Sequence, residues 1–283
     1  MDSALVPLGQ PTDPFTAYCD ADEIVAFAHA INHPNPLYLN GQATPPTYAV
    51  VPALPVLLSV AGLPPEATEG SIGGVHGTHD LYVRKRIEPG TRLHTTGERC
   101  AVTTSKAGMN VVVRLTSRDD AGEVAIEQYW STLMRGPVTG GDQGDTLAEH
   151  NFPESARAHL VGTLTLPTTQ DQTFRYAGAS GDRAAMHVND ESATRVGFPG
   201  KFNQGLCTLG IVSGGLIKLT AADDPRRVTR IAVRFAAPTF PGEDIEVSAY
   251  EVGMTDEGLR SYAFEAFSEG GAVLRHGRIE VRD

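Results

Sequence analysis

The sequence predicts an α+β fold made of two similar halves, each with one apolar helix followed by long antiparallel strands. Three observations support this prediction: a weak internal repeat, stretches in which apolar and polar residues alternate, and one uncharged apolar segment of helical length in each half. A sheet wrapped around such a helix would bury the apolar surfaces of both.

The repeat is visible at two pairs of landmarks. Asn35 begins the segment NPLY, and Ala184, 149 positions later, begins the similar segment AAMH. Pro89 and Pro241, each followed by glycine, are 152 positions apart. Similar offsets at two landmarks indicate a duplicated unit with insertions between them.

A linker is expected near the midpoint of the chain. Residues 136–145 are rich in glycine and turn-forming residues, which favour a connecting segment. We therefore expect an N-terminal unit over residues 1–140 and a C-terminal unit over residues 141–283.

The expected helices differ from ordinary surface helices. Residues 49–60 and 206–219 are apolar, and the segment 205–217 carries no charged residue and several glycines. A helix that is apolar on all sides is typically buried, and its glycines allow close packing. Period-two alternation predicts antiparallel strands, found within residues 111–115, 123–133, 230–235, 245–249 and 262–266.

The composition and the net charge argue against several classes of function. The 283 residues are 41% hydrophobic and 20% charged, which indicates a globular protein, and the net charge of −11 disfavours nucleic acid and anionic membranes as partners. The apolar stretches are too short for a transmembrane helix, the first residues do not resemble a secretory signal, and the three cysteines are widely spaced. These features predict a cytoplasmic protein without a metal site.

The segment from Tyr176 to Gly210 is the richest in chemistry-bearing residues. Asp182 precedes His187 by five positions, so a short turn can bring both side chains to one small volume. A carboxylate and an imidazole can hold one water and move a proton in both directions. Alternatively, Asp182 caps the turn and His187 is a structural histidine.

Gly205 follows Gln204 at the expected start of the second apolar helix. The first N–H groups of a helix lack internal partners, so they suit an oxygen that becomes negative in an enolate-like transition state. Glycine would let such an oxygen approach closely. The alternative is that this glycine serves packing alone.

The segment resembles the signature of the MaoC-like, (R)-specific enoyl-CoA hydratase and dehydratase family, in its double-hotdog form. The match has no gaps over more than 30 residues. The matching residues are Tyr176, Ser180, Gly181, Asp182, His187, Gly197, Phe198, Gly205, Leu206, Cys207 and Thr208.

The resemblance implies a hydro-lyase of fatty acid metabolism that adds water to 2-enoyl thioesters or removes it, without a metal or other cofactor. Asp182, His187 and Gly205 would be catalytic, and the substrate would be an acyl-CoA or another acyl thioester. The implied substrate-binding residues are Tyr176, Ser180, Gly181, Arg183 and Gln204. Dimers are common in the family, so a homodimer is one expected state.

The first half resembles the family's degenerate N-terminal hotdog, which shapes the acyl tunnel. His33 stands at the aspartate position and Tyr38 at the histidine position, so the water-activating pair is not rebuilt there in the same way. The resemblance therefore implies one active site per chain.

The match departs from the family in the second half at three positions. Ala184 and Ala185 replace an asparagine and a proline, and Gln204 replaces a histidine. These changes leave open a retuned substrate, a catalytically impaired subunit that binds acyl thioesters, or a thioesterase on the same scaffold.

Two further features of the first half are expected to be structural. His76 and His79 form a His-x-x-His pair without an evident third metal ligand, so they are interpreted as structural or surface histidines. Tyr129 and Trp130, on an expected strand, are interpreted as core or tunnel lining.

Overall fold

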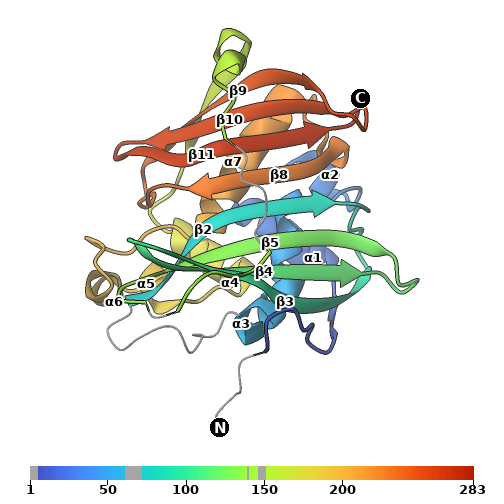
Figure 1. Cartoon of the computed structure of the whole chain (residues 1–283). Coiled ribbons are helices and arrows are strands. Elements are labelled where there is room, and N and C mark those ends of the chain that lie inside the picture. Colours follow the sequence, from blue (N-terminus) through green and yellow to red (C-terminus); the bar gives the residue numbers. More distant parts are fainter. Residues whose placement is uncertain (1–5, 61–71, 139, 146–150) are drawn as a thin grey trace.

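A computed structural model describes residues 6–60, 72–138, 140–145 and 151–283 (Figure 1). One antiparallel sheet runs through the protein in the order β1-β3-β4-β5-β2-β8-β11-β10-β9-β7, and β6 pairs with β3. The long helices lie on one face of this sheet (Figure 1).

Each half contributes one set of elements. The first comprises β1 (Phe15–Tyr18), α1 (Ala21–Ala30), α2 (Pro36–Leu39), the 3-10 helix η1 (Pro46–Ala49), α3 (Val50–Val60), β2 (Ile72–Val83), β3 (Arg92–Ser105), β4 (Gly108–Arg118) and β5 (Val124–Arg135). The elements that follow in the chain are β6 (Gln143–Gly144), η2 (Glu154–Ala158), β7 (Leu160–Pro167), α4 (Gln172–Ser180), α5 (Ala185–Val188), α6 (Asp190–Arg195), α7 (Gly205–Thr220), η3 (Pro225–Arg227), β8 (Val228–Phe235), β9 (Asp244–Met254), β10 (Arg260–Ser268) and β11 (Gly271–Val281).

The two halves repeat one topology. In both, an edge strand is followed by helices and then by four strands, and the sheet order of the second half mirrors that of the first about the β2–β8 pair. This arrangement is the double hotdog that the sequence led us to expect. The predicted central helices correspond to α3 and α7, and the predicted strands overlap β4, β5, β8, β9 and β10.

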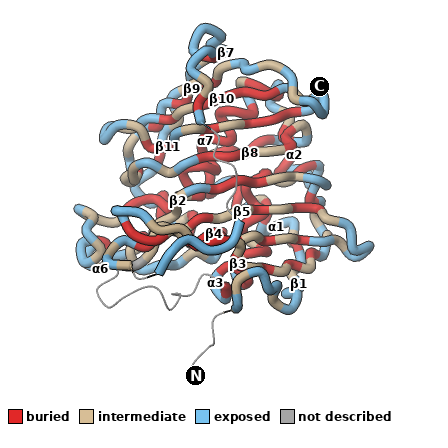
Figure 2. The backbone as a smooth tube through the Cα atoms, in the orientation of Figure 1, coloured by how far each residue is buried: buried red, intermediate tan, exposed pale blue. Residues whose placement is uncertain are grey.

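The core is built around α7. Nearly the whole helix is buried (Figure 2), as its uncharged sequence predicts. A Cβ on Gly210 would lie 2.6 Å from Cγ2 of Ile31, and one on Gly214 would lie 2.7 Å from Cγ of His33. The glycines therefore let α7 pack directly against the chain that follows α1 in the first half.

Local structure differs from the expectation in two places. The short helices around the central ones, such as α1 and α4, were not predicted. The expected linker is also partly ordered in the sheet, because Gln143 and Gly144 pair with Val102 and Ala101 of β3. The division of the chain at residues 140 and 141 remains a prediction.

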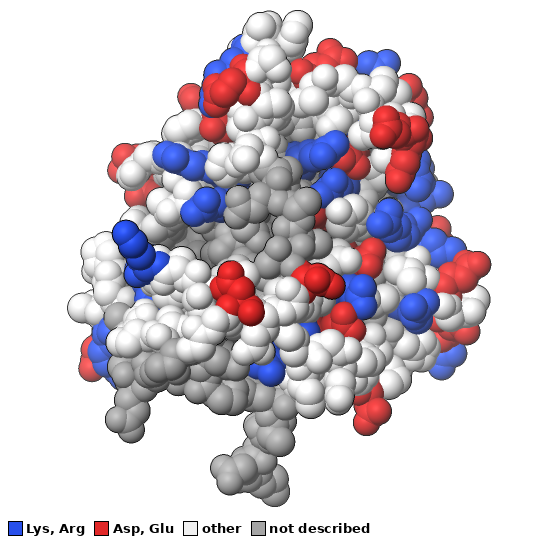
Figure 3. Space-filling view, in the orientation of Figure 1, with Lys and Arg blue, Asp and Glu red and all other residues white. Residues whose placement is uncertain are grey.

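The surface carries charges of both signs. On the face shown in Figure 3, Lys and Arg side chains lie interspersed with Asp and Glu side chains. Among the described residues, no helix is both long and apolar enough to span a membrane.

The two halves are joined by antiparallel pairing of β2 with β8, in which Asp80 lies opposite Ala232. Arg230 of β8 donates to both carboxylate oxygens of Asp80, over 2.9 and 2.7 Å, and its guanidinium lies over the ring of Tyr82. Burial lowers the pKa of Arg230, but the hydrogen bonds and charge of Asp80 raise it by more. The ion pair therefore reinforces the junction between the halves.

We expect Asp80→Asn to lower the free energy of unfolding by about 3 kcal/mol, because it leaves the largely buried Arg230 with only its longer, 3.4 Å contact to Glu280. Urea unfolding measures this loss. The control is the double variant Asp80→Leu/Arg230→Met, which removes both charges and should lose much less. Equal losses in the two variants would contradict the role of the ion pair.

Candidate active site

The chain carrying Asp182 is shaped by the end of α4. Gly181 ends that helix with a φ of 80°, a left-handed conformation that favours glycine. The N–H of Asp182 donates to Oγ of Ser180 over 3.1 Å, and the N–H of Ala184 donates to Oδ1 of Asp182 over 3.3 Å. This turn leads directly into α5, which carries His187.

His187 is buried, and one of its nitrogens is committed to the backbone. Nδ1 lies 2.9 Å from the carbonyl oxygen of Phe202. Because a carbonyl only accepts, Nδ1 carries the proton, and Nε2 of the neutral ring carries a lone pair. Burial lowers the pKa of His187, although the charge of Asp182 and the hydrogen bond to Phe202 act to raise it. His187 is therefore neutral at pH 7.

Asp182 is half-buried and close enough to His187 for its charge to act on the imidazole. Its charge also contributes, after burial, to raising the pKa of Tyr176. No direct side-chain hydrogen bond joins Asp182 and His187 in the described part of the chain. The two groups are thus neighbours, as the five-residue spacing allows, and a water between them could contact both.

Gln204 ties three segments of the site together. Its Nε2 donates to the carbonyl oxygens of Thr173 in α4 and of Asp182, over 3.3 and 3.2 Å. Gln204 is only 1% exposed and immediately precedes α7. It therefore fixes the Asp182 turn against the start of α7, a positioning role that requires no proton transfer.

Gly205 is the first residue of α7. The N–H of Thr208 donates to the carbonyl of Gln204, so the N–H groups of residues 205–207 precede the first N–H that donates within the helix. A Cβ on Gly205 would lie 3.2 Å from Cε1 of Phe235 and 3.5 Å from Nδ1 of His76. The glycine thus serves close packing here, and it also leaves its N–H without a side chain beside it.

The remaining predicted site residues differ in accessibility. Tyr176 and Ser180 are buried beside the Asp182 turn, and the hydroxyl of Tyr176 has no hydrogen-bond partner. Gly181 and Arg183 are exposed. Tyr176 can therefore contact only a buried group, whereas Arg183 can meet a charged group at the surface.

Several basic residues near the motif already have acidic partners. Lys201 lies 3.3 Å from Asp190, and the guanidinium of Arg226 lies 2.8 Å from Asp224. These cations are less available for substrate phosphates than Arg183, for which the described part of the chain shows no ion pair.

Sequence reasoning missed three contributors to the site. The carbonyls of Phe202 and Thr173 act through the backbone, which residue identity does not reveal. Asn203 is 2% exposed, and neither polar atom of its side chain has a hydrogen-bond partner. Its position between Phe202 and Gln204 is the signal that could have drawn attention to it.

The degenerate half lacks the arrangement seen around His187. Nε2 of His33 lies 3.3 Å from Oδ1 of Asp223, a residue of the second half, and the hydroxyl of Tyr38 is buried without a partner. His33 therefore links the two halves, and Tyr38 offers no imidazole at the position of His187. No cluster of metal-binding side chains occurs within the described residues.

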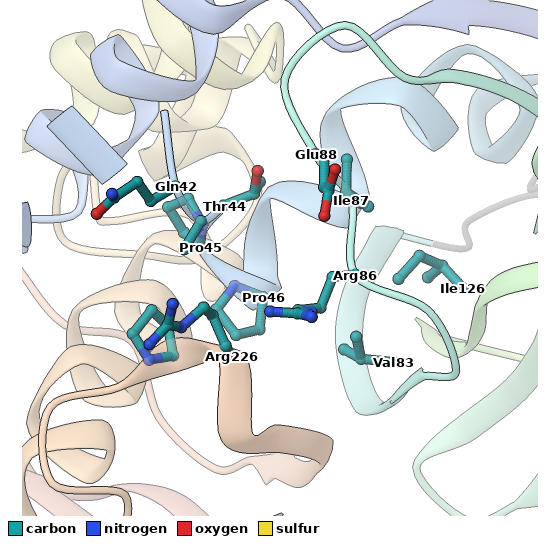
Figure 4. A pocket seen from close by; sticks show the side chains of 12 residues that line it. Gln42, Thr44, Pro45, Pro46, Val83, Arg86, Ile87, Glu88, Ile126 and Arg226 are labelled. Carbon is teal, nitrogen blue, oxygen red and sulfur yellow. The ribbon is translucent and has the colours of Figure 1, made fainter. Parts of the chain in front are cut away.

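A pocket lies at the opposite end of the β2–β8 pair, beside the start of α3 (Figure 4). Arg86 and Arg226 lie on its two sides. Asp182, His187 and Gly205 are not among the residues that line it. It corresponds, in the degenerate half, to the region of Gly205 in the second half. Its lining consists of Gln42, Ala43, Thr44, Pro45, Pro46, Val83, Arg86, Ile87, Glu88, Ile126, Pro225 and Arg226.

Solved structures place the fold in a known class. A MaoC-like dehydratase from Phytophthora capsici superimposes with a TM-score of 0.83 at 22% identity, over 98% of this chain and 97% of the other. A Mycobacterium tuberculosis protein described as having a double hotdog fold superimposes with a TM-score of 0.65 at 14% identity, over 97% and 96%. The chain is a double-hotdog protein, as predicted.

The sequence comparisons identify the domain more closely. The family model of the MaoC like domain matches residues 135–265 of this chain. The 3-hydroxyacyl-thioester dehydratase Y of Mycobacterium tuberculosis is 28% identical over 83% of this chain and 80% of its own length. The peroxisomal enoyl-CoA hydratase 2 of Arabidopsis thaliana is 34% identical over 62% and 58%.

We expect Ala184→Asn to stabilise the protein by about 1 kcal/mol, because Ala184 occupies the N-cap of α5 without a capping side chain. Its counterpart Asn35 caps α2 by accepting from the N–H of Leu37 over 2.9 Å. Thermal unfolding should show a rise in Tm of roughly 2 °C. The reciprocal variant Asn35→Ala should lower Tm, and an unchanged or lower Tm for Ala184→Asn would refute the capping argument.

Proposed function

We propose that the protein catalyses the reversible addition of water to 2-enoyl thioesters, giving 3-hydroxyacyl thioesters. The observation that supports this most is the neutral His187, whose Nδ1 is held by Phe202 and whose Nε2 is left as a base beside Asp182. The names of the relatives, a 3-hydroxyacyl-thioester dehydratase and an enoyl-CoA hydratase, agree with this chemistry.

In the proposed reaction, Asp182 and His187 hold the attacking water. Nε2 of His187 takes one proton as the water oxygen bonds to C3, and the electrons of the C2–C3 double bond move toward the thioester oxygen. The imidazolium then returns the proton to C2. Water is consumed, the pair recovers its starting state, and dehydration follows the same steps in reverse.

The negative charge on the thioester oxygen needs a stabilising donor. We assign this role to the N–H of Gly205 and to the positive end of the α7 dipole. One donor of this kind lowers a barrier by about 3 kcal/mol. Gln204 supports the arrangement by holding the Asp182 turn against the start of α7.

The proposal also covers the residues that contact the substrate, the cellular compartment and the oligomeric state. Tyr176, Ser180 and Gly181 would line the acyl thioester near the catalytic pair, and Arg183 would pair with phosphates of coenzyme A at the surface. The first half would shape the acyl tunnel. A cytoplasmic enzyme, alone or as a homodimer, is consistent with these assignments.

A second candidate is an acyl-thioester-binding subunit with little turnover. Ala184 favours it, because this residue lacks the side chain that caps the matching helix of the first half. Free thiol released from acyl-CoA, with the enoyl absorbance unchanged, would instead indicate a thioesterase.

The direct test is hydration of a panel of trans-2-enoyl-CoAs, followed by loss of the conjugated thioester absorbance. Asp182→Asn should lower kcat by about 10²- to 10⁴-fold, since the amide cannot supply the carboxylate that holds the water. The control Glu191→Gln removes a nearby exposed carboxylate and should keep full activity. Unchanged turnover in Asp182→Asn would exclude the proposed pair.

The pH profile provides a separate test. His187 must be neutral to accept a proton, and burial lowers its pKa below 6.5. The acid limb of kcat/KM should therefore lie below pH 6.5, with a plateau through pH 7. A limb above pH 7 would show that a different group is the base.

A further inference from the structure

The strand β2 brings a histidine of the first half to the start of α7. Along the β2–β5 pair, His76 lies opposite Thr132 and His79 lies opposite Trp130, so β2 advances three residues while β5 advances two. This β-bulge contains Gly77, where a Cβ would lie 2.7 Å from Oγ of Ser131. Bulges often redirect a side chain beside a functional site.

The bulge places both histidines against one indole. Residues three apart on a regular strand face opposite sides of the sheet. Here His76 stacks on Trp130, with ring centroids 3.5 Å apart and planes at 7°, and His79 meets the same ring edge-on at 5.5 Å. The orientation of the His76 ring is therefore fixed by packing.

His76 lies next to Gly205. Its ring centroid is 4.2 Å from that of Phe235, and its Nδ1 is 3.5 Å from the position of a Cβ on Gly205. A thioester oxygen held by the N–H of Gly205 would thus bring the rest of the substrate close to this imidazole.

One nitrogen of His76 is unused. Nε2 is buried without a hydrogen-bond partner, whereas the backbone of Thr78 acts to raise the pKa of the ring. Burial and the neighbouring His79 outweigh this effect and hold the pKa of His76 well below 6.5. The low pKa keeps the ring neutral, and a ring proton on Nδ1, toward the backbone of Thr78, leaves a lone pair on Nε2. A buried acceptor without a partner is costly unless a ligand satisfies it.

We propose that His76 contacts the substrate and that its Nε2 accepts a hydrogen bond from an O–H or N–H group of the acyl thioester. This inference rests on the proposed function, because it takes Gly205 as the thioester site. Two parts of such a substrate carry a donor: a hydroxyl on the acyl group and the amide N–H of the pantetheine arm. Either would give the first half a role in substrate selection.

The test compares His76→Phe with His79→Phe. Both variants replace an imidazole that contacts Trp130 with an aromatic ring, but only His76 adjoins Gly205. We expect His76→Phe to raise the KM for its preferred substrate roughly 5- to 10-fold with little change in kcat, the effect of one lost hydrogen bond. His79→Phe should keep the wild-type KM. Circular dichroism and Tm establish that both variants fold.

Binding measurements separate this inference from the proposed reaction. Calorimetric titration of Asp182→Asn, with and without His76→Phe, reports affinity in the absence of turnover. A weaker affinity for 3-hydroxyacyl-CoA but not for saturated acyl-CoA identifies the acyl hydroxyl as the donor, and an equal loss for both identifies the pantetheine amide. Unchanged affinity and KM in folded His76→Phe would overturn the role of His76, whatever the fate of the hydratase proposal. Absence of turnover in the wild-type protein would overturn the hydratase proposal alone.

Discussion

The pairing of β2 with β8 is the constraint on which the rest of the structure depends. It makes one sheet from two halves, and it sets His76 of the first half beside Phe235 of the second, in contact with the start of α7. The Asp80–Arg230 ion pair lies within the same pairing. Small changes in this register would move the wall of the candidate site, because a one-residue slip turns each side chain of a strand to the opposite face.

The two halves differ at matching positions of the repeated unit. At the matching helix starts, Asn35 has kept a capping side chain and Ala184 has not, although both have the extended backbone of an N-cap. At another matching position, the second half has His187 where the first has Tyr38. The turn with a capping side chain therefore lies in the half that has a tyrosine at this position, and the turn without one leads to His187.

The overall fold could be predicted from the sequence because it depends on burial. An uncharged helix such as α7 and alternating strands such as β8 specify which surfaces must be covered. The spacing of Asp182 and His187 allowed the two side chains to meet, but spacing alone left open a turn cap and a structural histidine. The bulge that turns His76 toward Gly205 was not predictable, because it is a difference in register between two strands distant in sequence. The acceptor carbonyl of Phe202 was equally hidden, since every residue has a carbonyl.

The use of backbone acceptors explains how the site can tolerate substitution around it. His187 is oriented by the carbonyl of Phe202, and the Asp182 turn is held through its own carbonyl by Gln204. Because these acceptors belong to the main chain, they persist when neighbouring side chains change. Any side-chain N–H donor of the right reach can satisfy the carbonyls of Asp182 and Thr173, so a glutamine can stand where the family has a histidine. The orientation of His187 is thus set by the fold, and the side chains around it can change without loss of these contacts.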